Sequence, residues 1–136
     1  MSAGTAVQAA LMDALRADAG VQSVFGDPAR VFDAETDEPA FPYAQLETHD
    51  LQPAGAALVD GHAHRISLAV FSREGGLQAA KAAVASLRAA VEAADWAVPG
   101  WHVVMAHVVY SDVMRTADRR TFRGLIRIRI ISEEAA

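Results

Sequence analysis

The chain has 136 residues and a formal net charge of −5, with 12 basic and 17 acidic side chains, five histidines and no cysteine. A chain of this length forms one domain with a substantial core, so we expect a single domain over residues 1–136. The lack of cysteine excludes disulfides and thiolate metal sites. The acidic balance argues against a protein that holds nucleic acid through phosphate contacts.

No segment predicts a membrane span. The longest apolar run, Val103–Tyr110, is interrupted by His107 and is far shorter than the ~20 residues that cross a bilayer. The first residues, Met1–Thr5, lack the basic and apolar regions of a signal peptide. We therefore expect no membrane partner and a protein that stays inside the cell that makes it.

The first periodic segment predicts a helix. Apolar side chains recur every four residues from Val7 to Leu15 and so share one helical face, with Thr5 as the N-cap and Gly20 at the C-terminal stop. Residues 21–25 are expected to continue as a turn or short helix. Arg30–Phe32 are expected to form a short extended piece.

An acidic segment follows. Residues 33–42 contain two prolines and four carboxylates, which are Asp33, Glu35, Asp37 and Glu38. Carboxylate oxygens suit a divalent cation, but the glycine and terminal glutamate of a calcium loop are missing. We interpret the segment as a solvated loop.

Two strands are predicted next, in residues 43–49 and 64–71. In the first, Tyr43, Gln45, Glu47 and His49 alternate with less polar residues and predict one polar face. In the second, Ile66, Leu68 and Val70 share one face, which we assign to the core. Residues 51–61, rich in Ala, Gly and Pro, are expected to connect the two strands.

A histidine pair is the one hint of a ligand site. His62 and His64 lie on the same side of a strand, and His49, His102 and His107 are possible further ligands. The sequence does not show which residue, if any, would lie close enough to His62 and His64 to be a third metal ligand. We therefore prefer solvent-facing histidines at the start of a strand, and we predict no metal and no cofactor.

The second half of the chain predicts a helix and two strands. The helix carries a continuous apolar stripe, made by Leu77, Ala80, Val84, Leu87, Val91 and Ala94. Residues 103–110 are apolar on both sides, which is typical of a strand that is central in its sheet or covered by a partner. Residues 111–118 are expected to be a polar connection, residues 120–131 the last strand and residues 132–136 a frayed tail.

The element order is helix, strand, strand, helix, strand, strand. It predicts an α+β fold, an antiparallel sheet of about four strands with two main helices packed on it. No serine lies in a nucleophile motif, and Gly75–Gly76 lacks the lysine of a phosphate-binding loop. We therefore expect no enzyme activity.

Arginines form the constellation of greatest interest. In the last strand Arg123, Arg127 and Arg129 share one face, and Arg65 on another strand is a candidate to join them. The planar guanidinium favours carboxylate pairs across an interface. An ordinary solvent-exposed sheet face remains the alternative.

Several segments together resemble a known family. They are the Leu-x-x-x-Leu helix in Ala9–Ala19, Arg30–Phe32 followed by Phe41–Glu47, His64–Phe71 with the helix Leu77–Val91, and Arg119–Gly124 at the start of the last strand. In type and order they are similar to the tail-completion or tail-terminator proteins of phages, prophages and gene transfer agents. The resemblance covers nearly the whole chain.

The resemblance implies a structural particle protein without catalysis. It implies a ring, commonly a hexamer, that caps the tail tube and offers its other side to the head or neck, so the implied partners are the tail tube protein and a head-tail connector or neck protein. It implies assembly in the cytoplasm of the producing cell and a final place at the neck or tail end. A head-side connector and a small ligand-binding α+β domain remain alternatives.

Two expectations follow for the ring. Arg127 and Arg129 should pair with carboxylates of the neighbouring subunit, with the segment Asp33–Glu38 as the candidate. DNA should pass through the lumen without specific binding, because a net negative protein does not hold phosphates.

Overall fold

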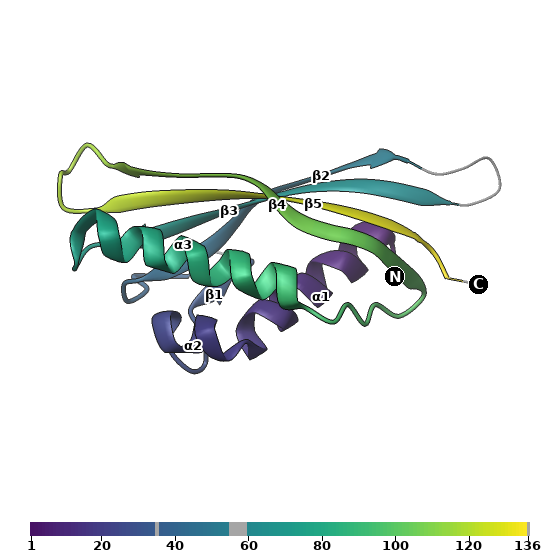
Figure 1. Ribbon diagram of the computed structural model, residues 1–136, viewed down its shortest axis with the longest axis horizontal. Helices are drawn as coiled ribbons and strands as arrows, with labels where there is room; N and C mark the ends of the chain where they lie inside the picture. The colour runs from purple at the N-terminus through teal and green to yellow at the C-terminus, as the bar shows by residue number, and fades with distance from the viewer. Residues whose placement is uncertain (35, 55–59, 136) are drawn as a thin grey trace.

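Three helices cover one face of a five-stranded sheet in the computed structural model, which describes residues 1–34, 36–54 and 60–135 (Figure 1). The elements in chain order are α1 (Ala3–Ala17), α2 (Ala19–Phe25), β1 (Val31–Phe32), β2 (Tyr43–Pro53), β3 (Gly61–Ser72), α3 (Gly76–Ala93), β4 (Trp101–Arg115) and β5 (Phe122–Glu134). None of the described helices is long and apolar enough to cross a membrane.

The sheet has the strand order β1-β2-β3-β5-β4. The short β1 pairs in parallel with β2, and all other neighbours are antiparallel. The predicted α+β class and antiparallel sheet are confirmed. The fifth strand is β1, which the sequence indicated only as an extended piece.

The core lies between the sheet and the helices. The apolar stripe of α3 buries Ala80, Val84 and Leu87 against the sheet as predicted, although Leu77 at its start is 44% exposed. Close approach of α3 requires Gly124 in β5, because a Cβ there would lie 2.6 Å from Cγ2 of Val84. A side chain at this position would therefore force Val84 or the helix that carries it to shift.

The N-terminal helices differ from the prediction in their ends. Helix α1 begins at Ala3 because the Ser2 hydroxyl accepts a hydrogen bond from the backbone N–H of Thr5, so Thr5 is not the cap. The chain turns at Asp18, whose carboxylate accepts from the N–H of Val21 at 2.9 Å and caps α2. The expected stop at Gly20 is therefore wrong, since this glycine lies inside α2.

Strand β4 is an edge strand, which overturns the interpretation of its apolar run as central. The reason is that β5 pairs with β3 along its whole length and leaves β4 on the outside. β4 also continues to Arg115 and β5 to Glu134, so the expected polar connection over 111–118 and the frayed tail are wrong where these strands run.

Candidate functional site

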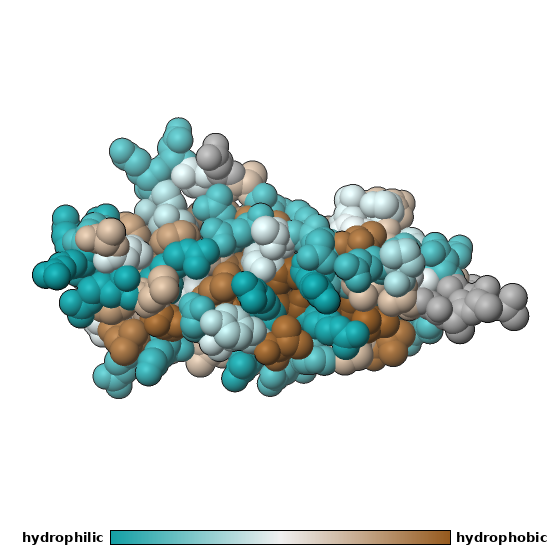
Figure 2. All heavy atoms as spheres, turned by 90° about the horizontal axis from the view of Figure 1, so that it is seen from above, coloured by the Kyte–Doolittle hydropathy of each residue, from teal (hydrophilic) through white to brown (hydrophobic). Residues whose placement is uncertain are grey.

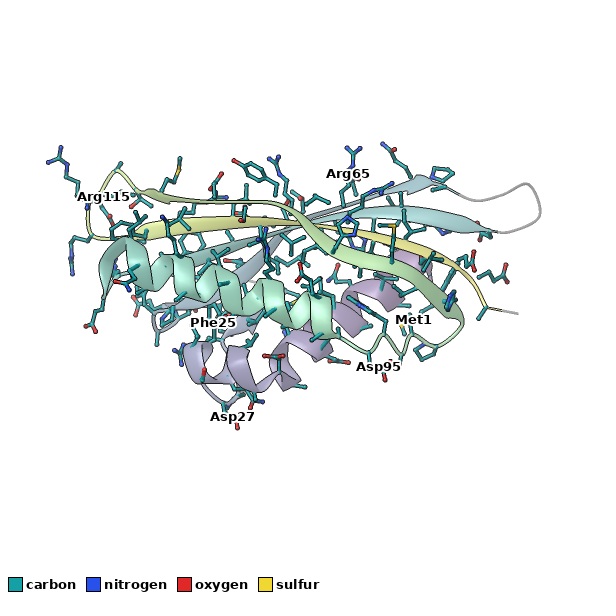
Figure 3. The ribbon with its side chains drawn as sticks, in the orientation of Figure 1. Met1, Phe25, Asp27, Arg65, Asp95 and Arg115 are labelled. Carbon is teal, nitrogen blue, oxygen red and sulfur yellow. The ribbon has the colours of Figure 1, made fainter. Side chains whose placement is uncertain are left out.

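The sheet face away from the helices is the most distinctive surface. β5 alternates so that Ile126, Ile128 and Ile130 point to the core and Arg127 and Arg129 point outward. Figure 3 shows Arg65 of β3 on this same side, pointing away from the helices. Figure 2 looks onto this open face, where hydrophilic side chains lie among apolar patches.

A depression of about 590 Å³ lies in the open face. All four long strands contribute to it. Its lining includes Thr48 and Asp50 of β2, Arg65 of β3, Tyr110 of β4, and Arg127 and Arg129 of β5. The structure thus brings together three of the four arginines that the sequence singled out.

Among the described residues, the three guanidinium groups have no carboxylate partner. Arg65 lies directly opposite Arg129 in the β3–β5 register, and Cζ of Arg127 lies 5.1 Å from the ring centroid of Tyr110. None of the three makes an ion pair with a described carboxylate, although Asp50 lies opposite Arg65. The depression is therefore a cationic site that stays available to an anion.

Tyr110 is held in place by a neighbour on its own strand. Its hydroxyl donates a hydrogen bond to Oδ2 of Asp112 at 2.7 Å, and this bond raises the pKa of Tyr110 above its ordinary value. The ring thus has a defined position beside Arg127. The ring face of Tyr110 can therefore stabilise the guanidinium of Arg127 by a cation–π contact.

The remaining predicted residues lie elsewhere. Arg123 donates to Oε1 of Glu47 at 2.6 Å and is not part of the depression. In the acidic segment, Asp33 lies 3.6 Å from Arg16 of α1, whereas Asp37 and Glu38 are exposed. Glu35 lies outside the described residues.

His49 and His64 form a hydrogen-bonded chain in which His64 is buried, instead of the predicted solvent-facing pair. His64 is fully buried, with Nδ1 at 2.8 Å from Nε2 of His49 and Nε2 at 2.7 Å from Oγ of Ser132. Nδ1 of His49 lies 3.5 Å from Oε1 of Gln8 in α1. The expectation of solvent-facing histidines is wrong for His64, because its side chain points to the helix side of β3.

A β-bulge explains why His49 joins this chain. The β2–β3 register shifts between Leu46 and Thr48, so Glu47 falls out of the alternation. His49 therefore points toward His64. The prediction that His49 and Glu47 share one polar face is wrong. Burial lowers the pKa of His49 and lowers that of His64 to about 4, so we assign both rings as uncharged near neutral pH.

The histidine geometry supports a structural role. Within the described ranges, no three His, Asp or Glu side chains are placed to hold a metal ion. His62 packs edge-on against Trp101 with ring centroids 5.5 Å apart and lies 3.7 Å from Asp60. The chain Gln8–His49–His64–Ser132 instead links α1 to three strands of the sheet.

Sequence reasoning missed Tyr110 and Asp50 as parts of the site. Tyr110 lay at the end of the predicted strand, and a second bulge between Val108 and Tyr110 sets its place opposite Arg127. Asp50 lay at the edge of the predicted strand in residues 43–49. Their relevant signal is cross-strand register, which local alternation does not contain.

Comparison with known proteins agrees with this architecture. Among solved structures, a chain of the virion of a native gene transfer agent (GTA) particle is similar over 98% of this chain and 99% of that chain, with 27% identity and a TM-score of 0.85. Curated proteins give no match. The family model described as tail completion protein gp17 matches residues 9–133, which run from the middle of α1 to the penultimate residue of β5. The chain therefore belongs to the tail completion protein gp17 family.

Proposed function

We propose that this protein is a structural component of a phage-like particle that forms a ring, caps the end of the tail tube and joins it to the head or neck. Family membership and the similarity to a chain of a gene transfer agent particle support a role in tail completion. The single observation that carries the ring is the long, exposed edge strand β4.

Strand β4 has the properties of a surface that another protein covers. Four of its large side chains are strongly exposed, with fractions of 52% for Val104, 53% for Val109, 44% for Tyr110 and 55% for Met114. An edge strand also presents backbone N–H and C=O groups to a neighbour. Apolar side chains on an open edge are typical of a contact between subunits.

The two edges of the sheet differ, which favours a ring. One edge is the long β4, and the other is β2 with the two-residue β1. A contact between two different surfaces of one protein is head-to-tail, and it closes into a ring when the rotation allows. We propose six copies, as is common in this family.

The proposal includes no catalysis and no specific DNA binding. The net charge of −5 disfavours a lumen that retards DNA by holding its phosphates. The partners are the tail tube protein and a connector or neck protein. Assembly takes place in the cytoplasm of the producing cell.

The first experiment measures the mass of the purified protein by light scattering across a range of concentrations. We expect a hexamer-sized species that Val104→Asp with Val109→Asp dissociates. The matched control is Leu77→Asp, which changes an apolar residue of similar exposure that belongs to α3 and not to β4. An unchanged mass in the double variant would contradict the role of β4.

The second experiment locates the protein in the particle by electron microscopy of a tagged copy. Density at the head-proximal end of the tail tube is expected. Density only on the head of particles that lack tails would contradict the tail cap and would favour a head-side connector. Particles without the protein should show unjoined heads and tubes, because an uncapped tube end stays open.

A further inference from the structure

We infer that the depression on the open face is the docking site for the acidic segment Asp33–Glu38 of the neighbouring copy, with Asp37 and Glu38 as the contacting carboxylates. The inference rests on the proposed ring. It names the two surfaces that meet at each subunit boundary.

The charge arrangement of the depression calls for an anion. Arg65 and Arg129 are cross-strand neighbours, and like charges directly opposite one another repel. Arg127 adds a third positive charge on the same wall. Carboxylates that accept hydrogen bonds from these guanidinium groups would remove the repulsion and form charge-assisted pairs.

The surroundings favour a protein carboxylate over a nucleic acid. Asp50 lines the same depression. A polyphosphate backbone laid across this face would meet this carboxylate, whereas a short acidic peptide can place single carboxylates at the arginines. The exposed side chains of Val109 and Tyr110 add apolar contact area of the kind found at protein interfaces.

The acidic segment and the depression lie in different places within one subunit. The segment connects β1 to β2, at the sheet edge opposite β4. Its first residue, Asp33, is held toward the helical layer by Arg16 of α1. Arg65, which lines the depression, points away from the helical layer (Figure 3), so the segment of another copy is the one that fits the depression.

The segment has carboxylates available for such a contact. Asp37 and Glu38 are exposed and make no ion pair with another described residue. Each copy therefore offers one cationic depression and one acidic segment. Repeating this contact from copy to copy gives the head-to-tail arrangement that closes a ring.

A charge-swap experiment tests the pairing. The variants are Arg127→Glu with Arg129→Glu, Asp37→Arg with Glu38→Arg, and the combination of all four. Light scattering should show a ring for the wild type. Each double variant should need a concentration about tenfold higher or more to assemble, and the combined variant should assemble again near the wild-type concentration.

The matched control is Lys81→Glu with Arg88→Glu, which makes the same change of net charge on exposed positions of α3. It should assemble like the wild type. If the wild type forms a ring and the Arg127/Arg129 variant assembles equally well, the inference is overturned while the proposed ring stands.

A second measurement separates the two proposals if the wild type stays monomeric. A synthetic peptide with the sequence of residues 31–42 is titrated into the full-length protein and followed by calorimetry. Binding that Arg127→Glu with Arg129→Glu abolishes would support the docking site even without a ring in solution. The docking site would be overturned if the peptide did not bind the monomer, or if it bound the Arg127→Glu, Arg129→Glu variant equally well. Binding of duplex DNA through these arginines at moderate salt would also overturn it.

Discussion

The two faces of strand β5 show how one segment serves two purposes. Ile126, Ile128 and Ile130 are at most 1% exposed and pack beneath the helices, whereas Arg127 and Arg129 between them face solvent. The inward face contributes to the stability of the subunit through apolar burial. The outward face lacks such burial and carries Arg127 and Arg129, which make no ion pair with a carboxylate of the described residues.

This difference separates stability from assembly. A change on the helix-covered face alters the free energy of unfolding, and a change in the depression alters contacts with other molecules. The contrast is useful for experiments because variants of the open face should remain folded. Losses of assembly in such variants can then be assigned to the interface.

The largest effect is expected from truncation in the core. Ile128→Ala should lower the free energy of unfolding by about 2–5 kcal/mol, because it leaves a cavity between the sheet and the helices. Gln52→Ala, on an exposed position of β2, should change it by less than about 0.5 kcal/mol. Urea unfolding followed by circular dichroism compares them, and equal losses would contradict the division between the faces.

A second effect concerns pH and the buried histidine chain. The folded-state pKa of His64 is about 4, below the ordinary value of 6.5, because burial and the neighbouring His49 and His62 disfavour its charge. Between these values the unfolded chain binds the proton more readily, so stability is lost as the pH falls from about 6.5 toward about 4. The loss should reach up to about 3 kcal/mol, measured by urea unfolding at a series of pH values.

Two variants isolate the contribution of His64. His64→Leu should have a lower stability at pH 7, because His49 and Ser132 lose a partner, but a flatter dependence below pH 6.5. His102→Gln, on an exposed position of β4, should keep the wild-type slope. An unchanged slope in His64→Leu would assign the acid sensitivity to other groups.

The smallest effect is expected for the ion pair of the open face. Arg123 and Glu47 are partly exposed, with side-chain fractions of 31% and 37%. A double-mutant cycle with Arg123→Ala and Glu47→Ala should give a coupling of about 0.2–1 kcal/mol, because solvent screens the pair. A coupling well above this range would mean that part of the open face stabilises the subunit.

The candidate site was only partly predictable. The alternation of β5 identified Arg127 and Arg129 as outward residues, and Arg65 was expected to join them from another strand. The roles of Tyr110 and Asp50 depend on the register between strands. Arg123 is not part of the depression because it pairs with Glu47, which the β2 bulge places within hydrogen-bonding distance of it.

The sequence by itself determined the features that repeat along the chain: the apolar stripe of α3, the two faces of β5 and the α+β class. These features follow from the 3.6-residue and two-residue periods, which are local. Only the tertiary structure decided that β4 is an edge, that Asp18 divides the first helices and that His49 meets His64. The physical reason is that strand order and bulges depend on contacts between residues distant in the chain, and caps depend on competition among local hydrogen bonds. The spacing of apolar residues contains no information about either.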